Sequence, residues 1–181
     1  LHTNVGDITL VLYNDTPLHR DNFLNNVLEG CYDGKTFNRV IADFVVQCGE
    51  EELEDVIPAE ICYPKHFHKR GALAMGRCTD DAEKLLRSSR YQFYISWGNV
   101  ADKKRIARAK QLMRERSYGR CEMNKACEQY YAGNPGLPSL DGSYTVFGEV
   151  KSGMEIVERI QAMPTDSLDR PLDDVLILST S

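Results

Sequence analysis

The residue of this sequence best placed for chemistry is an arginine inside a short apolar strand. Arg39 lies in the segment 36–41, which is rich in apolar residues and follows an Asp-Gly turn signal. Alternation along a strand gives Arg39 the parity of Phe37 and Ile41, so we expect the three side chains to leave one face. A strand arginine taken by itself most often lies on an exposed surface. The residue type alone therefore does not establish a site.

Metal and thiol chemistry have weaker support. His66 and His68 have an H-x-H spacing that could place both on one strand face, but no further ligands can be identified. We therefore interpret both histidines as exposed loop residues. The six cysteines are spread without a C-x-x-C pair, which argues against a zinc site. For Cys48 and Cys78, inert packing is favoured over a redox role.

The composition is that of a globular chain without a membrane-spanning run. Its 181 residues can bury a sizeable core without disulfides. No apolar run approaches the roughly 20 residues that cross a bilayer, and the net charge of −5 gives no reason to expect nucleic-acid binding. We expect free thiols in a reducing compartment, the cytoplasm. The periplasm is the alternative, because the chain starts at Leu1 and a leader could have been removed.

Two helices and several short strands must position these residues. Thr16 as N-cap and Pro17 at the first position predict a helix that ends at Gly30. A capping box that begins at Ser152 predicts a last helix, which ends before Pro164. We predict strands at 7–13, 36–41, 44–47, 71–75, 91–96, 144–147 and 175–178. Many short strands favour a closed or nearly closed sheet in an α+β or all-β fold.

The segment 100–136 departs from this pattern and is predicted to be a helical insertion. Its first half has high helical propensity, with a thin apolar stripe of Ile106, Leu112 and Met113. Residues 103–120 hold eight Lys or Arg and one Glu, a local charge of +7, so the rest of the chain carries −12. We interpret it as a solvated helix packed on one side. The alternative is a docking surface for an acidic partner or a nucleic acid.

Four stretches resemble the cyclophilin family of peptidyl-prolyl cis/trans isomerases, in that family's order. They are Gly6-Asp7-Ile8 with Pro17-x-x-x-x-Asn22-Phe23, then 32–47, then 71–75 with 92–95, and last 140–148. The second is the family's signature, in which the position of Asn38 is usually His. The resemblance is to a bacterial-like member and implies one mainly β domain over 1–181. Its expected fold is an eight-stranded antiparallel barrel capped by two helices, with 100–136 inserted.

The resemblance also implies an activity, the rotation of Xaa-Pro bonds in unfolded or flexible protein chains. That rotation crosses a barrier of about 20 kcal/mol. Because it breaks no covalent bond, it needs no metal and no cofactor. Arg39 aligns with the family's catalytic arginine. In the twisted state the prolyl nitrogen gains a lone pair, to which an always-charged guanidinium can donate.

The same alignment implies the remaining site residues. Gln47 and Gln92 align with residues that orient the arginine and contact the substrate backbone. The alternative is that their side chains only form hydrogen bonds with buried polar groups of the strands. The pocket for the proline ring is implied at Phe44, Val45, Tyr94, Leu140 and Tyr144. Tyr94 replaces the more usual Phe, so its hydroxyl needs a partner or solvent. Tyr144 stands where the family often has His. Its ring can form part of the pocket wall, and its hydroxyl can donate a hydrogen bond.

Several departures from the family pattern bear on substrate preference. Ser139 stands where many members carry a Trp that contacts cyclosporin, which implies weak binding of that inhibitor. Arg77 and Cys78 replace small residues that line the substrate groove, and we expect them to reshape it. The acidic loop 50–55 is shorter than its counterpart.

Two other functions compete with an active isomerase. The first is a catalytically weak proline-binding module or scaffold, tethered through the basic insertion and suggested by the altered groove loop. The second is a nucleic-acid-associated factor, which rests only on the +7 segment. The acidic remainder of the chain opposes it, because that charge would repel phosphate.

Overall fold

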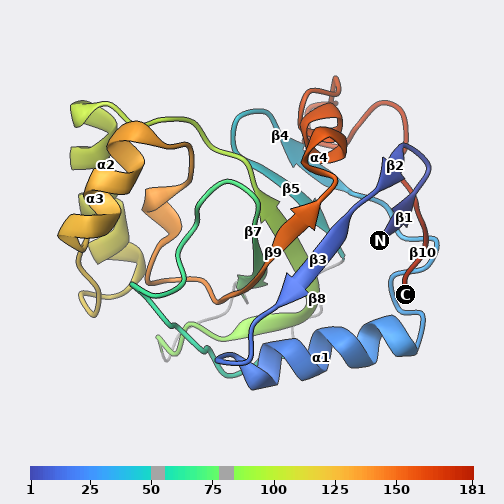
Figure 1. Ribbon diagram of the computed structural model, residues 1–181, viewed down its shortest axis with the longest axis horizontal. Helices are drawn as coiled ribbons and strands as arrows, with labels where there is room; N and C mark the ends of the chain where they lie inside the picture. Colours follow the sequence, from blue (N-terminus) through green and yellow to red (C-terminus); the bar gives the residue numbers. More distant parts are fainter. Residues whose placement is uncertain (50–55, 78–83) are drawn as a thin grey trace.

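The computed structural model describes residues 1–49, 56–77 and 84–181. Within them, a seven-stranded antiparallel sheet has the order β3-β9-β7-β8-β5-β4, with β6 paired to β8, and a three-stranded sheet has the order β10-β1-β2. The larger sheet consists of β3 (Thr9–Leu12), β4 (Arg39–Ile41), β5 (Val45–Cys48), β6 (Val56–Ile57), β7 (Ala72–Arg77), β8 (Ser88–Ser96) and β9 (Val146–Ser152). The smaller consists of β1 (His2–Thr3), β2 (Gly6–Asp7) and β10 (Ile177–Ser179), which brings the chain ends together (Figure 1).

The expectation of a closed eight-stranded barrel was wrong for the described residues. The larger sheet is open, with β3 and β4 as its edges. The predicted strand 7–13 breaks at Ile8, whose side chain is buried in the core. β2 on one side of the break pairs with β1, whereas β3 on the other side pairs with β9. One apolar run is therefore shared between two sheets.

Alternation along β5 and β8 sends successive side chains into two apolar clusters. Val46, Phe93 and Ile95 pack in the larger cluster, which forms the main core. Val45 and Tyr94 leave the opposite face and belong to a smaller cluster. The sheet therefore separates the main core from a second face that can carry a site.

Two helices cover the larger sheet close to their predicted positions, but neither has the predicted N-terminal side-chain cap. α1 (Pro17–Leu28) packs on β8 and β9, and α4 (Met154–Gln161) packs on β4 and β5 (Figure 1). The buried face of α1 is largely polar. Leu24 and Leu28 are exposed, whereas the buried Asn22 and Asn26 each donate a hydrogen bond to the carbonyl of Arg90 at 2.8 Å.

The expected capping box of α4 is absent. Ser152 is the last residue of β9, and Gly153 takes the N-cap position with φ of +94° and no side-chain cap. A Cβ at Gly153 would lie 2.3 Å from the carbonyl oxygen of Asp7, so the close approach of β2 requires glycine here. Ile156, Val157 and Ile160 form an apolar stripe on α4 that is buried.

The insertion forms two helices, α2 (Lys103–Arg116) and α3 (Lys125–Gly133), to one side of the sheet (Figure 1). Asp102 caps α2 and Asn124 caps α3, each with its side chain. Of the predicted stripe, Ile106 and Met113 are buried, whereas Leu112 is partly exposed. α2 also packs on the short 3-10 helix η1 (Pro138–Leu140). Among the described residues, no helix combines the length and apolar character needed to cross a membrane.

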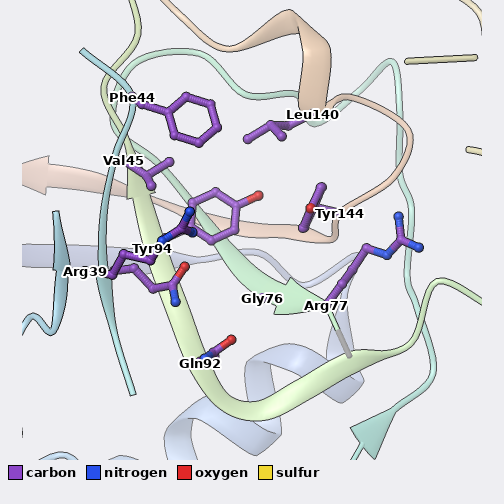
Figure 2. Close-up of a pocket in the computed structure, with 10 residues that line it drawn as sticks. Arg39, Phe44, Val45, Gly76, Arg77, Gln92, Tyr94, Leu140 and Tyr144 are labelled. Atoms are coloured by element: carbon purple, nitrogen blue, oxygen red, sulfur yellow. The ribbon is translucent and has the colours of Figure 1, made fainter. Parts of the chain in front are cut away.

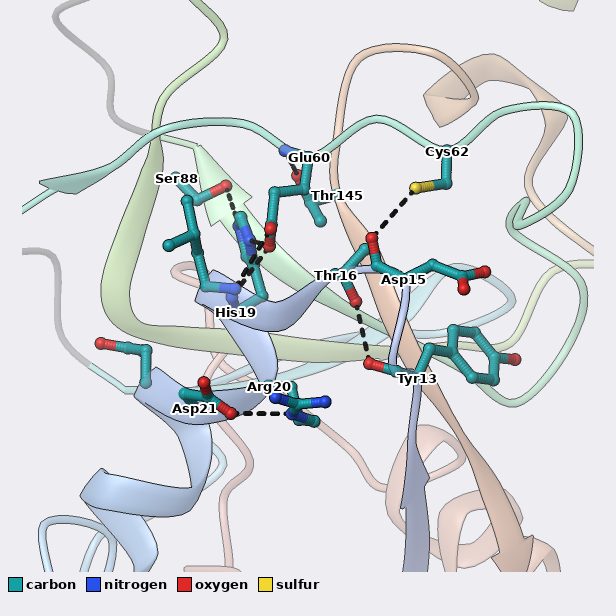
Figure 3. Close-up of polar contacts among 12 residues, drawn as sticks. Tyr13, Asp15, Thr16, His19, Arg20, Asp21, Glu60, Cys62, Ser88 and Thr145 are labelled. Carbon is teal, nitrogen blue, oxygen red and sulfur yellow. Dashed lines mark hydrogen bonds and ion pairs between the residues drawn. The ribbon is translucent and has the colours of Figure 1, made fainter.

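The start of α1 is anchored by a distant carboxylate instead of the predicted Thr16 cap. The Thr16 hydroxyl makes no cap bond, and the Glu60 carboxylate accepts from the backbone N–H groups of Leu18 at 3.1 Å and His19 at 2.9 Å. The same carboxylate lies 2.7 Å from Nδ1 of the fully buried His19, whose Nε2 lies 2.9 Å from the Ser88 hydroxyl (Figure 3). Glu60 thus joins the helix terminus to the sheet.

We expect Glu60→Ala to destabilise the protein by about 2–3 kcal/mol, because it leaves two helical N–H groups and one histidine without their acceptor. Glu158→Ala, an exposed site on α4, is the control and should change the free energy of unfolding by less than about 0.5 kcal/mol. Urea unfolding measures both. Equal changes in the two variants would contradict the anchoring role.

Burial lowers the pKa of His19, partly offset by the hydrogen bond and charge of Glu60. The unfolded chain binds this proton near pH 6.5, at about the ordinary value, and the folded chain binds it only at lower pH. Stability should therefore fall as pH drops below this value, by up to about 1.4 kcal/mol per pH unit. Urea unfolding at several pH values should show a shallower fall for His19→Gln than for wild type. Parallel profiles would exclude His19 as the cause.

Candidate active site

One cavity gathers every site residue that the sequence predicted. It has a volume of about 330 Å³ and opens on the face of the larger sheet that lies away from the main core. Its lining residues are Arg39, Phe44, Val45, Gln47, Gly76, Arg77, Gln92, Tyr94, Leu140 and Tyr144 (Figure 2). The structure therefore places all eight predicted site residues around one cavity, together with Gly76 and with Arg77, which was expected to reshape the groove.

The register of three strands sets the polar side of the cavity. Arg39 of β4 pairs with Gln47 of β5, and Gln47 pairs with Tyr94 of β8. Residues directly opposite across antiparallel strands share a face and lie about 5 Å apart at Cβ. Gln92 precedes Tyr94 by two residues and has the same parity. The arginine, both glutamines and the tyrosine therefore face one space.

The Arg39 guanidinium is accessible and weakly paired. Its side chain is 47% exposed, and its one ion pair among the described residues joins Nε to Oδ2 of Asp169 at 3.7 Å. Figure 2 shows the guanidinium extending toward the Tyr94 ring. An exposed pair at this distance contributes little and leaves the guanidinium N–H groups available to a ligand.

The expected parity of Arg39 with Phe37 was wrong. β4 begins at Arg39, so the strand alternation does not reach Phe37. Phe37 is buried in the main core beside Val40, on the other side of the sheet from Arg39. Ile41 shares the Arg39 parity within the strand, as predicted.

Apolar and aromatic side chains form the rest of the wall. Val45, Tyr94 and Leu140 are at least 95% buried, and Phe44 and Tyr144 are partly exposed at the opening. The Tyr94 and Tyr144 rings meet edge to face at 5.9 Å. This slot excludes water from one side of a small apolar ring and offers Arg39 and two amides on the other.

The Tyr94 hydroxyl ends a buried chain of hydrogen bonds. It lies 2.9 Å from Nε2 of His68, and Nδ1 of His68 lies 2.9 Å from Oδ1 of Asp141. The other Asp141 oxygen accepts from the Tyr131 hydroxyl at 2.7 Å. All four side chains are at least 97% buried. The carboxylate can only accept, so Nδ1 of His68 carries the proton and Nε2 accepts from Tyr94.

Burial raises the pKa of Tyr94 well above its usual value, and it also raises the pKa of Tyr131, with the Asp141 charge acting in the same direction. Both phenols therefore stay neutral donors. The interpretation of His68 as an exposed loop residue was wrong. The one signal for this network was the prediction that the Tyr94 hydroxyl needs a partner. The partner comes from 26 residues earlier in the chain, and neither Asp141 nor Tyr131 was identified from the sequence.

His66 is also less exposed than expected, with a side chain 13% exposed. It stacks on Tyr13 at 4.0 Å and lies 2.9 Å from Asp15. The part of the chain that the structure describes holds no cluster of three or more His, Cys, Asp or Glu suited to a metal ion. The Cys48 side chain is buried, which raises the pKa of its thiol to about 12 and keeps it protonated.

Arg77 joins the cavity to the insertion. Its guanidinium donates to the Arg116 carbonyl at 3.2 Å and to the Tyr118 hydroxyl at 3.1 Å. It also lies 5.6 Å from the centre of the Tyr144 ring, within cation–π range. Arg77 therefore lines the cavity, as its position in the sequence suggested. Cys78 and the acidic loop 50–55 lie outside the described residues.

The chain is similar to several known proteins. A family model described as "Cyclophilin type peptidyl-prolyl cis-trans isomerase/CLD" matches residues 1–181. The peptidyl-prolyl cis-trans isomerase cypE of Dictyostelium discoideum is 30% identical over 195 residues that cover all of this chain and 94% of cypE. The Arabidopsis thaliana peptidyl-prolyl cis-trans isomerase CYP71 is also 30% identical, but this chain spans only 24% of its length.

Solved structures show the same fold. The crystal structure of a cyclophilin type peptidyl-prolyl cis-trans isomerase from Cryptosporidium parvum matches with a TM-score of 0.70 and 23% identity. The match covers 99% of this chain and 92% of the Cryptosporidium parvum chain. A crystal structure of the same protein in the presence of the dipeptide Ala-Pro matches with a TM-score of 0.69, at 23% identity, over 99% of this chain and 94% of that one.

The buried chain predicts a specific cost for removing one hydroxyl. Tyr94→Phe keeps the ring but leaves Nε2 of His68 without its donor, so we expect a loss of about 1–3 kcal/mol in the free energy of unfolding. The Tyr144 hydroxyl makes no hydrogen bond with the described residues, so Tyr144→Phe should cost less than about 0.5 kcal/mol. Thermal or urea unfolding distinguishes the two variants. A cost for Tyr94→Phe no larger than that for Tyr144→Phe would contradict the network.

Proposed function

This chain belongs to the cyclophilin-type peptidyl-prolyl cis-trans isomerase family, and we propose that its 330 Å³ cavity rotates Xaa-Pro bonds in unfolded or flexible protein chains. One observation carries the proposal: an accessible guanidinium faces the same open cavity as an apolar slot. The activity would make the protein a rotamase that assists protein folding.

The reaction needs little from the protein except positioning. The planar Xaa-Pro amide must twist through a state without conjugation, over a barrier of about 20 kcal/mol. Uncatalysed rotation takes tens to hundreds of seconds. No covalent bond breaks, so the proposed reaction uses no metal and no cofactor. A group accelerates it only when it binds the twisted state better than either planar form.

In the proposed mechanism, the proline ring fills the slot of Phe44, Val45, Tyr94, Leu140 and Tyr144. The bound proline ring fixes the prolyl side of the Xaa-Pro bond, so the carbonyl group of the preceding residue rotates relative to the ring. Exclusion of water by the slot strengthens every electrostatic contact made at the bond. The network behind Tyr94 stiffens this wall, because the side chain cannot swing about its Cα–Cβ bond to another rotamer without breaking the hydrogen bond to His68.

Arg39 supplies the preference for the twisted state. As conjugation is lost, the prolyl nitrogen becomes pyramidal and gains a lone pair that can accept a hydrogen bond. Arg39 donates to this nitrogen, and its charge does not depend on physiological pH. Gln47, opposite Arg39 in the strand pairing, orients the guanidinium. Gln92 binds the backbone of the client chain.

The proposed clients are proline-containing peptides and unfolded proteins. The family supports this class, and the related Cryptosporidium parvum structure was determined in the presence of Ala-Pro. An acidic partner for the basic segment 103–120 is part of the same proposal, whereas the net charge of −5 argues against a nucleic acid. A cytoplasmic location stays a prediction.

We expect Arg39→Ala to lower kcat/KM for an Ala-Pro peptide by about 100-fold, the cost of removing one donor aimed at the transition state. Arg39→Lys should recover only part of this loss, because a lysine cannot reproduce the planar fork. Arg159→Ala, at an exposed position of α4, is the matched control and should leave kcat/KM unchanged. A protease-coupled assay measures all four proteins.

Two results would contradict the proposal. Equal turnover in wild type and Arg39→Ala would exclude Arg39 as the catalytic donor. Proline-peptide binding by wild type without turnover would favour the proline-binding module or scaffold instead.

A further inference from the structure

A second groove adjoins the proline cavity and has no part in the proposed reaction. It has a volume of about 380 Å³ and lies between α2 and the loops around Phe44, Asn99 and Leu137. The short helix η1 separates the two spaces, because Leu140 lines the first cavity and Pro138 and Ser139 line the second. Phe44 lines both. A chain that leaves the proline slot across Phe44 therefore enters this groove.

The groove combines an apolar floor with a cationic rim. Apolar side chains of α2 and of the segment 137–138 line its floor, among them Leu112 and Leu137. Lys104, Arg105 and Arg108 line its rim on exposed positions of α2. Positions 104, 108 and 112 follow one another at four-residue spacing and so lie on one side of the helix.

Two basic residues of α2 that lie outside the groove lining have carboxylate partners, whereas the rim cations have none among the described residues. Lys110 pairs with Glu128 at 2.8 Å, and Arg114 pairs with Glu122 at 2.8 Å. Within the described parts of the chain, Lys104, Arg105 and Arg108 make no ion pair, and Arg108 donates only to Gln111 of its own helix. Five basic residues of α2 have no ion pair with the described residues, and three of them, Lys104, Arg105 and Arg108, line the groove.

The groove is held in place without a ligand. Arg116 of α2 donates to the Ser139 carbonyl at 3.0 Å, and the Leu137 N–H donates to the His68 carbonyl at 2.8 Å. Ile106 and Met113 bury the opposite side of α2. A client would therefore lose little free energy to ordering of the protein.

We propose that this groove is a second subsite for the client chain, which selects segments with an acidic side chain and an apolar neighbour close to the isomerised proline. The inference rests on the proposed function, because the proline slot supplies the other anchor of the same chain. The apolar neighbour packs on Leu112 and Leu137, and the acidic group lies over the cationic rim.

The groove fits an isolated acidic side chain better than a run of phosphates. Asp43 also lines it, beside Phe44, and would repel an anion at that end. The remainder of the protein is acidic, with a net charge of −5 for the whole chain. A polyanion would therefore meet repulsion on both sides of the rim, whereas a single carboxylate with an apolar neighbour would not.

The test uses pairs of peptides that share an Ala-Pro core and differ only by Glu or Gln at one of four positions before or after it. For wild type, we expect kcat/KM to favour Glu over Gln by about fivefold at one or two adjacent positions on one side of the proline. The preference should shrink as salt is raised from about 0.05 M to 0.5 M, because the rim is exposed.

Charge-reversed variants locate the preference. Lys104→Glu combined with Arg108→Glu should invert it, so that Gln peptides become the better substrates. Arg120→Glu makes the same kind of charge change in the insertion at an exposed residue outside the groove, and it should retain the wild-type preference. Equal kcat/KM for Glu and Gln at every position, with turnover intact, would overturn the subsite and leave the isomerase proposal standing.

A binding measurement keeps the two proposals separate. Fluorescence anisotropy with Arg39→Ala should show the Glu preference in binding even though kcat/KM is about 100-fold lower. If wild type turns over no peptide yet binds Glu peptides more tightly, the isomerase proposal fails and the subsite stands. If Glu and Gln peptides bind equally while a single-stranded RNA homopolymer binds in a way that depends on Lys104 and Arg108, the groove takes nucleic acid and the subsite proposal is wrong.

Discussion

The candidate site depends on the antiparallel register that pairs Arg39 with Gln47 and Gln47 with Tyr94. Because side chains alternate along a strand, a slip of one residue would move these groups into the main core and expose Val46 and Phe93. Those two residues are fully buried, so the hydrophobic effect holds the register. The stability of the core and the placement of the cationic site are therefore two consequences of one strand pairing.

A tyrosine in the wall of an apolar slot is costly unless its hydroxyl is satisfied. Here Nε2 of His68 accepts a hydrogen bond from the Tyr94 hydroxyl, and Asp141 fixes the tautomer of His68. The Tyr131 hydroxyl donates to the second oxygen of the Asp141 carboxylate. Each residue of this hydrogen-bonded chain forms a hydrogen bond with a buried polar atom of the preceding residue, which would otherwise have no partner. Because Tyr131 belongs to α3, the wall of the slot is joined to the insertion through hydrogen bonds as well as through packing.

The insertion consequently forms part of the site. η1, which carries Leu140 into the proline slot, packs on α2 and is tied to it by Arg116. Arg77, at the end of β7, bonds the C-terminal end of α2 and lies over Tyr144. The same helix carries unpaired cations at a second groove. In the proposed subsite, this one basic helix would attract acidic clients locally, while the net negative charge of the whole chain would repel polyanions.

The sequence by itself determined the features that local patterns encode. Pro17 and Gly30 set the ends of α1, and the family resemblance identified eight of the ten residues that line the cavity. Tertiary structure decided what depends on distant partners. His68 is buried because Asp141 and Tyr94 satisfy both of its ring nitrogens. The N–H groups at the start of α1 are bound by Glu60 instead of Thr16, and the larger sheet is open. A local pattern specifies the conformation of its own few residues, but a hydrogen-bond partner many residues away exists only once the chain has folded.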